Sequence, residues 1–259
     1  MAAGGLRRVQ AVAANTFRES IRERVLYNLI FFAILMTLSG LLIGELSIRQ
    51  DAKIIKDIGF AAMDFFGSLI AIFIGVGLVS KEIERRSLYP LLAKPLSRDE
   101  LFLGKFLGLA FTLLVNTAVM SVGLAAALLL ARRPADPGIL EAIYPIYLGL
   151  LLTVALAMLF STLTSSALAA VCTVGVVVAG RYSDVVRNMR EVLPQAPGSL
   201  VMLLYRVIPD FAKLDFKDRV AYGDPVGASV LALVTAYAAA YTTIVLLLGL
   251  WAFRARDFQ

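Results

Sequence analysis

The chain has 259 residues, 59% of them hydrophobic, and a mean hydropathy of +0.81. Soluble domains contain about 45–50% apolar residues, so this composition excludes an ordinary soluble protein and predicts an all-α, polytopic membrane protein. The net charge is +6, and because the charges lie between apolar runs, it indicates contact with the membrane surface rather than nucleic-acid binding. Histidine is absent and Cys172 is the single cysteine, which excludes His-based metal sites, His acid–base chemistry and an intrachain disulfide.

The first predicted element is an amphipathic helix over residues 6–26. Charged residues fall on one face, and the apolar residues on the other are Leu6, Val9, Ala13, Phe17 and Ile21. This pattern predicts a helix that lies in the headgroup plane of the membrane. The alternative is the ordinary basic flank of a membrane span.

Six apolar runs follow, and they predict six transmembrane helices. Their ranges are 27–44, 59–80, 101–131, 139–163, 166–180 and 226–253. No internal repeat or linker divides them, so residues 1–259 are expected to form a single membrane domain.

Two of the connections between these spans are distinctive. Only residues 161–166 separate the fourth and fifth spans, which predicts a tight, uncharged hairpin. The longest connection is 181–224, and within it residues 199–208 are apolar but too few to span, which predicts an interfacial or re-entrant helix. Asp224-Pro225 is typical of a helix start and is predicted to cap the last span.

The distribution of Lys and Arg sets the expected orientation. With the N-terminus inside, the inner segments hold 13 of these residues and the outer segments 12, seven of which lie in the connection 181–224. Long connections count little in this rule, so we expect both termini to be cytoplasmic and 181–224 to be extracytoplasmic.

The segment 81–100, between the second and third spans, is rich in charge and contains two prolines. Its first residues extend the second span into water, and a short apolar patch follows at Leu88, Leu91 and Leu92. Ser97 and Glu100 have the spacing of a capping box that begins the third span. A short helix with charged flanks and an apolar tip is typical of docking in a groove of a soluble partner. A solvated loop with a helix lying on the membrane surface is the alternative.

The order of motifs around this segment resembles a known family. The second span ends in the acidic residues Glu82 and Glu84. A leucine-rich helix follows, with Ser87-Leu88 and Leu91-Leu92. The turn Pro95-Leu96-Ser97-Arg98 and the pair Gly104-Lys105 come next. This order resembles the cytoplasmic coupling region of the ABC-2 family of ABC transporter permeases, and the N-terminal helix is similar to that family's elbow helix. The chain departs from the pattern at Arg85-Arg86, where many members have Gly-Thr.

The resemblance implies the permease subunit of an ATP-driven exporter, with no catalytic residue and no metal of its own. The sequence lacks a G-x-x-x-x-G-K-[ST] phosphate loop, so ATP and Mg²⁺ are expected in a separate ABC ATPase subunit. The other implied partners are membrane lipids and a second copy of this chain or a similar permease. The implied location is the plasma membrane, which is the inner membrane in bacteria. The residues expected to couple to the ATPase are Glu82, Glu84, Arg85, Arg86, Leu88, Tyr89, Leu91, Leu92 and Lys94.

A substrate path is the second candidate site. Asp64 in the second span and Glu141 in the fourth are ionisable groups within apolar runs, which suggests a function, although both are near enough to a span end to reach the interface. Tyr237 and Tyr241 are one turn apart in the last span and either face the path or pack against a neighbouring helix. We take Asp64, Tyr237 and Tyr241 as candidates for the path.

Two other classes of membrane protein compete with this interpretation. An ion-coupled secondary carrier predicts charges in the middle of spans and broken helices, and neither is evident in the sequence. An intramembrane enzyme predicts a metal-binding motif, paired mid-membrane aspartates or a Ser–His arrangement, and the absence of histidine and of such a pair argues against it. The carrier remains the alternative.

Overall fold

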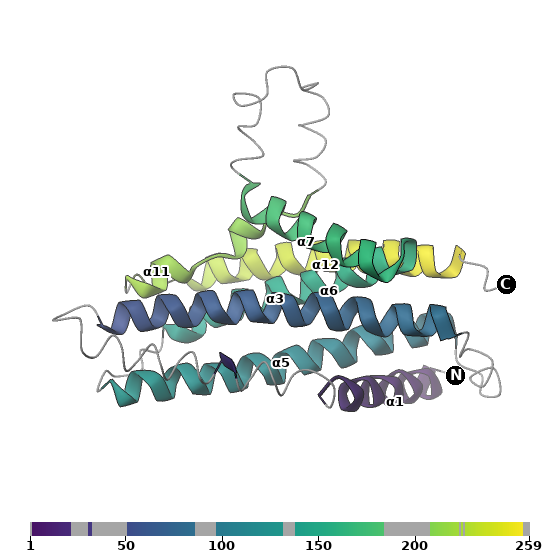
Figure 1. The fold of residues 1–259 in the computed structure, drawn as a ribbon, viewed down its shortest axis with the longest axis horizontal. Coiled ribbons are helices and arrows are strands. Elements are labelled where there is room, and N and C mark those ends of the chain that lie inside the picture. The colour runs from purple at the N-terminus through teal and green to yellow at the C-terminus, as the bar shows by residue number, and fades with distance from the viewer. Residues whose placement is uncertain are drawn as a thin grey trace, which may run out of the picture.

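The computed structural model describes residues 2–21, 31–32, 51–85, 97–131, 138–183, 208–222, 224 and 226–255. The elements in these ranges are helical (Figure 1). They are α1 (Ala2–Ser20), α3 (Asp51–Arg85), α5 (Arg98–Leu130), α6 (Ile139–Leu163), α7 (Ser166–Arg181), the 3₁₀ helix η2 (Phe211–Leu214), α11 (Lys217–Ala221) and α12 (Ala228–Ala255).

Within the described ranges, four helices are long and apolar enough to cross a membrane. They are α3, over Lys53–Leu78, and the whole of α5, α6 and α12. The prediction of an all-α membrane protein is therefore confirmed. The predicted fifth span is α7, which is apolar but has only 16 residues, and the predicted first span lies almost wholly outside the described residues. The number of six spans stays a prediction.

The four long helices lie side by side along the long axis of the molecule (Figure 1). Both chain termini lie at one end of the bundle, which we call the termini end. The last turns of α3 and α12 and the first turn of α5 lie at this end. Helix α11 lies at the opposite side, which we call the α11 end. The segment 86–96, which joins α3 to α5, therefore starts and finishes at the termini end.

Helix α6 is the centre of the bundle, and α12 is at its edge. In the most apolar stretch of each helix, 67% of the residues of α6 are buried but only 22% of those of α12. Small residues of α3 allow the close contact with α6: a Cβ added to Gly67 would meet Leu150 at 2.8 Å, and one added to Gly75 would meet Ala157 at 2.9 Å. Small residues in the second span thus serve packing within the chain, as in other membrane helix pairs.

Helix α1 packs against the first half of α5. A Cβ added to Gly104 would lie 3.0 Å from the carbonyl oxygen of Val9, and one added to Gly108 would lie 2.6 Å from that of Ala13. Glycines four residues apart thus let the two backbones approach. A helix is present over the predicted residues 6–26 as far as Ser20, and it begins four residues earlier than expected; residues 22–26 lie outside the described ranges. It runs alongside α5 (Figure 1), so its predicted position in the headgroup plane is not confirmed.

Local signals in the sequence set two of the helix boundaries. Ser97 and Glu100 form the predicted capping box: the Glu100 N–H donates to Ser97 Oγ and the Ser97 N–H donates to the Glu100 carboxylate. The predicted tight connection between the fourth and fifth spans is confirmed, since only Thr164 and Ser165 separate α6 from α7.

The last span starts two residues after its predicted position, and the predicted cap at Asp224 is wrong. Helix α12 begins at Ala228, and the Gly227 carbonyl accepts from the N–H groups of Val230 and Leu231. Asp224 does not cap it; its own N–H donates to the Arg219 carbonyl, so it closes the turn after α11 instead.

Candidate functional site

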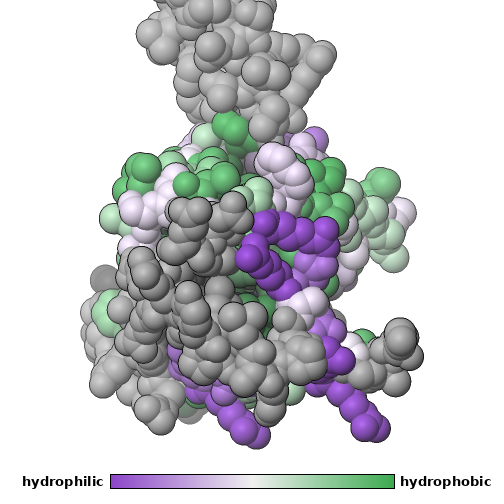
Figure 2. Space-filling view, turned by 90° about the vertical axis from the view of Figure 1, so that its right-hand side faces the viewer, coloured by the Kyte–Doolittle hydropathy of each residue, from purple (hydrophilic) through white to green (hydrophobic). Residues whose placement is uncertain are grey.

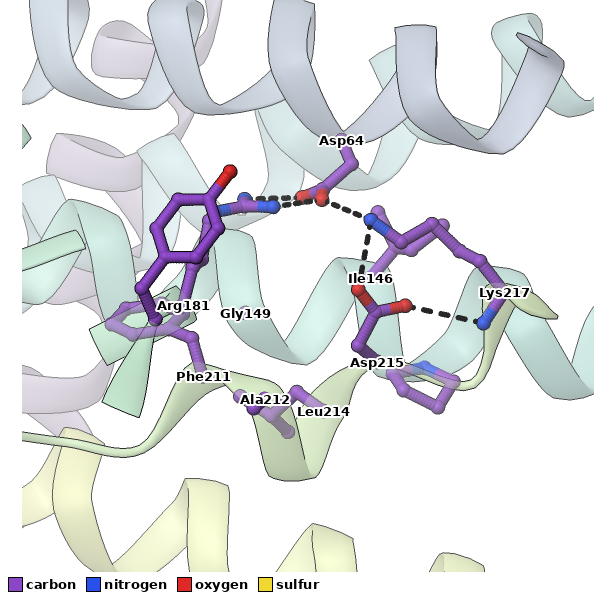
Figure 3. A pocket seen from close by; sticks show the side chains of 11 residues that line it. Asp64, Ile146, Gly149, Arg181, Phe211, Ala212, Leu214, Asp215 and Lys217 are labelled. Atoms are coloured by element: carbon purple, nitrogen blue, oxygen red, sulfur yellow. Dashed lines mark hydrogen bonds and ion pairs between the residues drawn. The ribbon is translucent and has the colours of Figure 1, made fainter. Parts of the chain in front are cut away.

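Asp64 accepts charged hydrogen bonds from two cations, Arg181 and Lys217 (Figure 3). The guanidinium of Arg181 binds both carboxylate oxygens, in the two-pronged geometry that makes Arg–carboxylate pairs strong. Lys217 Nζ lies 2.7 Å from Asp64 Oδ2, and it also lies 3.1 Å from a carboxylate oxygen of Asp215. We call Asp64, Arg181, Lys217 and Asp215 the Asp64 cluster.

Three helices and one connection bring the cluster together. Asp64 lies in α3, Arg181 is the last residue of α7, Lys217 is the first of α11, and Asp215 lies between η2 and α11. Gly180 allows α7 to contact the segment just before η2, because a Cβ at this position would lie 2.3 Å from the Pro209 carbonyl oxygen. The cluster therefore fastens the C-terminal end of α7 and the η2–α11 segment to α3.

Burial strengthens these ion pairs. The side chains of Asp64, Lys217 and Arg181 are 11%, 17% and 29% exposed. Burial by itself lowers the pKa of Lys217, but the carboxylates of Asp64 and Asp215 outweigh it, so the pKa of Lys217 is raised above its ordinary value. The lysine is therefore charged at neutral pH.

A cavity of about 230 Å³ adjoins the cluster. Asp64, Arg181 and Lys217 form its polar wall, and Pro145, Ile146 and Phe211 belong to its apolar wall. Among the described residues, no group of three His, Cys, Asp or Glu side chains is placed to hold a metal ion. The charges satisfy one another, so the arrangement suits a mechanical fastening between helices rather than acid–base chemistry.

The other residues considered for a substrate path have structural partners. The Glu141 carboxylate accepts from the Val226 N–H at 2.7 Å and so holds the chain just before α12. Tyr237 Oη accepts from the Asp210 N–H at 2.7 Å, and its ring lies 4.8 Å from that of Tyr241. These contacts favour the packing interpretation of both tyrosines, and their assignment to a path stays a prediction.

At the termini end, the first turn of α5 makes a second set of ion pairs and a hydrogen bond to other helices. The Asp99 carboxylate binds the guanidinium of Arg254 in α12, with one N–O distance of 2.7 Å, and Arg98 donates to the Arg254 carbonyl at 3.1 Å. Glu100 lies 3.5 Å from Arg8 of α1. Figure 2 shows this end of the molecule, with hydrophilic side chains among apolar ones. The first turn of α5 is therefore connected to both α1 and α12.

Gly104-Lys105 also acquires a structural role here. Gly104 admits α1, as described above, and Lys105 points the other way: its Nζ donates to the Leu78 carbonyl of α3 at 2.7 Å. The Lys105 side chain is buried, and the carbonyl oxygen gives its ammonium group a hydrogen-bond partner. This pair therefore joins α5 to α1 and to α3.

The predicted coupling residues are only partly described. Glu82, Glu84 and Arg85 belong to the last turns of α3, which continues beyond the predicted end of the second span. Arg86, Leu88, Tyr89, Leu91, Leu92 and Lys94 lie outside the described residues. Their role in docking stays a prediction.

Sequence reasoning named Asp64 but missed its partners. Arg181 and Lys217 belong to the long charged connection of the sequence, where their pairing is not visible. The signal available was charge balance, since an acid within an apolar helix needs a cation from elsewhere.

Comparison with known families gives the class of protein. The sequence profile of a family described as "ABC-2 family transporter protein" matches residues 10–181, which is more than half of the chain. The chain belongs to this family. No curated protein sequence matches it significantly. The match covers the second half of α1 and the whole of α3, α5, α6 and α7, up to and including Arg181 of the Asp64 cluster. This ABC-2 protein is thus a multi-pass membrane protein and the membrane component of a transporter, of a kind that associates with an ABC ATPase.

Proposed function

We propose that this ABC-2 permease exports its substrate across the bacterial inner membrane, with both termini in the cytoplasm. A separate ATPase subunit, which binds the ATP and Mg²⁺, drives it by docking on residues 82–94 of the segment 81–100. A second copy of this chain, or a similar permease, completes the membrane part.

The observation that supports this proposal is the set of contacts at the start of α5. The segment 86–96 leads directly into the turn that holds α12 through Arg254 and α1 through Arg8. Its other end continues α3, which is connected to α5 by Lys105. Movement of a docked partner against this segment would therefore act on four helices at once.

Helix α3 extends this connection to the far side of the membrane. It is a single helix of 35 residues, about 52 Å long, with the predicted docking residues in its last turns. Asp64 lies about 20 Å from its first residue and fastens α7 and α11 to it. A shift of α3 at the termini end would consequently strain the Asp64 cluster. ATP binding in the partner then favours one packing of these helices over the other, and hydrolysis restores the first.

The docking step is tested with Leu91→Asp, which places a charge in the apolar patch. An unpaired charge is costly to bury, so co-purification with an ABC ATPase encoded beside this chain should be lost while the amount of permease in the membrane is unchanged. Ala135→Asp is the matched control, because it adds the same charge to the connection between α5 and α6, and it should retain the ATPase. Co-purification of Leu91→Asp at the parent's level would contradict the proposal.

The transmission step is tested with Asp99→Asn, which removes the ion pair to α12 but leaves the segment 81–96 unchanged. This variant should bind the ATPase normally, and the permease should no longer change the rate of ATP hydrolysis in lipid vesicles as the parent does. ATP hydrolysis by the permease alone would contradict the requirement for a separate subunit.

A further inference from the structure

A groove at the α11 end lies between the η2–α11 segment and the first turns of α12. Its volume is about 580 Å³, and it shares only Ala212 and Asp215 with the lining of the cavity beside Asp64. Val230, Leu233 and Val234 form its apolar wall on α12, and Lys213 and Arg219 contribute its cations. One wall is thus apolar and the other is basic.

Among the described residues, the cations of the basic wall have few acidic partners. Arg219 is exposed and has no ion pair among the described residues. Lys213 has only a long contact, 3.6 Å, with Asp210, and its side chain is 59% exposed. Asp215, the acid in the groove, is already bound by Lys217 at 3.1 Å. A guanidinium without a carboxylate partner in the described part of the chain, beside an exposed ammonium, favours an anion such as a phosphate.

The apolar wall continues along the membrane-facing side of α12. Leu233 is 71% exposed, and the exposed side chains farther along the helix include Ile244, Leu247, Leu248 and Trp251. Helix α12 is the least buried of the four long helices, so this strip faces the surroundings of the bundle. In a bilayer the surroundings are acyl chains.

Tyr237 lies where the two walls meet. It lines the groove, its ring is 5.1 Å from Lys213 Nζ, and its hydroxyl accepts from the Asp210 backbone. Tyrosine with an apolar body and a polar tip is typical of the boundary between headgroups and hydrocarbon. Tyr237 therefore favours a position of the groove at this boundary.

We propose that this groove binds a membrane phospholipid with an anionic headgroup, from the leaflet at the α11 end. Arg219 and Lys213 bind the phosphate, and an acyl chain lies against Leu233 and the exposed strip of α12. The inference goes beyond the proposed function, because it requires only that the chain is embedded in a bilayer and does not involve the ATPase.

The experiment uses the full chain in lipid vesicles and its single tryptophan. In a Trp251→Phe background, Leu233→Trp places a fluorescent reporter in the groove. The vesicles consist of phosphatidylcholine with a small fraction of a lipid whose acyl chains are brominated. In one set this brominated lipid is phosphatidylglycerol, and in the other it is phosphatidylcholine, at the same mole fraction. Bromine quenches tryptophan only at short range, so the ratio of the two quenching curves gives the relative affinity of the groove for the anionic lipid.

We expect the groove reporter to show a preference of about threefold for phosphatidylglycerol, the size that one partly exposed ion pair supplies. Arg219→Gln combined with Lys213→Gln should reduce this ratio to about one, the value for no headgroup selectivity. The native Trp251, at the other end of the same helix, is the matched reporter, and the same two substitutions should leave its ratio unchanged.

Three results would overturn the proposal. One is equal quenching of the groove reporter by the two lipids. Another is a preference for phosphatidylglycerol at the groove reporter that survives removal of both cations, or whose loss is matched by an equal loss at Trp251. The third is no quenching by either lipid, which would mean that protein, such as a second copy of the chain, covers the groove.

Discussion

Asp64→Asn tests whether the buried ion pairs hold the bundle together. The substitution keeps the size of the side chain but leaves Arg181 without a carboxylate and Lys217 with Asp215 alone. Removal of one partner from a buried ion pair costs about 3–5 kcal/mol, because the other charge stays out of water without compensation. Since the three side chains retain some exposure, from 11% to 29%, we expect the lower end of that range, about 3 kcal/mol.

The loss is measured by thermal unfolding of the purified permease in detergent. For a chain of this size 1 kcal/mol corresponds to about 2–4 °C, so Asp64→Asn should lower Tm by about 6–12 °C. The matched control is Asp57→Asn, two turns earlier on the same helix, where no ion pair is made among the described residues. It should change the stability by no more than about 0.5 kcal/mol.

A double-mutant cycle assigns the loss to particular pairs. Arg181→Gln in the Asp64→Asn background should cost much less than Arg181→Gln alone, with a coupling energy of about 2 kcal/mol. The coupling of Asp64 to Lys217 should be smaller, because Lys217 keeps Asp215 and contacts one oxygen of Asp64, whereas Arg181 contacts both. If Asp64→Asn lowers Tm no more than Asp57→Asn, or the cycle shows no coupling, the ion pairs do not fasten α7 and α11 to α3.

Three further predictions follow from the packing, the charge and the topology. Gly108→Ala should destabilise the protein by about 1–3 kcal/mol and expose α1 to proteolysis, because the added Cβ would meet a carbonyl oxygen of α1 at 2.6 Å. The control is Gly77→Ala, which should be neutral or stabilising because no heavy atom lies within 4 Å of the added Cβ. Because the pKa of Lys217 is raised, its ion pairs contribute fully to the stability of the fold below the ordinary value of 10.5, and this contribution is lost as the pH rises through the higher folded-state pKa. The Tm difference between the parent and Lys217→Met should therefore be constant to about pH 10 and shrink above it. The orientation is tested with single cysteines in a cysteine-free background and an impermeant maleimide, on intact cells whose outer membrane is permeabilised. Tyr222→Cys, at a position that is 70% exposed, should react and Ala93→Cys should not. Labelling of Ala93→Cys from outside would reverse the orientation.

Hydropathy alone located the long helices. The predicted span 139–163 has the same limits as α6, and the predicted 101–131 differs from α5 by three residues at its start and one at its end. Such segments are readable because a membrane helix needs about 20 apolar residues and satisfies its own backbone hydrogen bonds, so its identity depends on nearby sequence. The capping box of Ser97 and Glu100 was predictable for the same reason, since its partners are three residues apart.

The order of motifs around 81–100 also indicated the family from the sequence alone. Those motifs did not predict the contacts of Gly104 and Lys105, because the role of each residue depends on which helix packs beside it. Only the packed structure shows that Gly104 faces α1 while Lys105 reaches α3.

The sequence by itself determined where the four long apolar helices lie and where α5 starts, because hydropathy and capping act over a few turns of one helix. The tertiary structure decided what the charges do. Asp64 meets Arg181 and Lys217 across 117 and 153 residues, and Asp99 meets Arg254 across 155. Neither the pattern of α3 nor that of α5 contains these partners. A buried charge selects its partner by distance in space, and that distance exists only after the helices have packed.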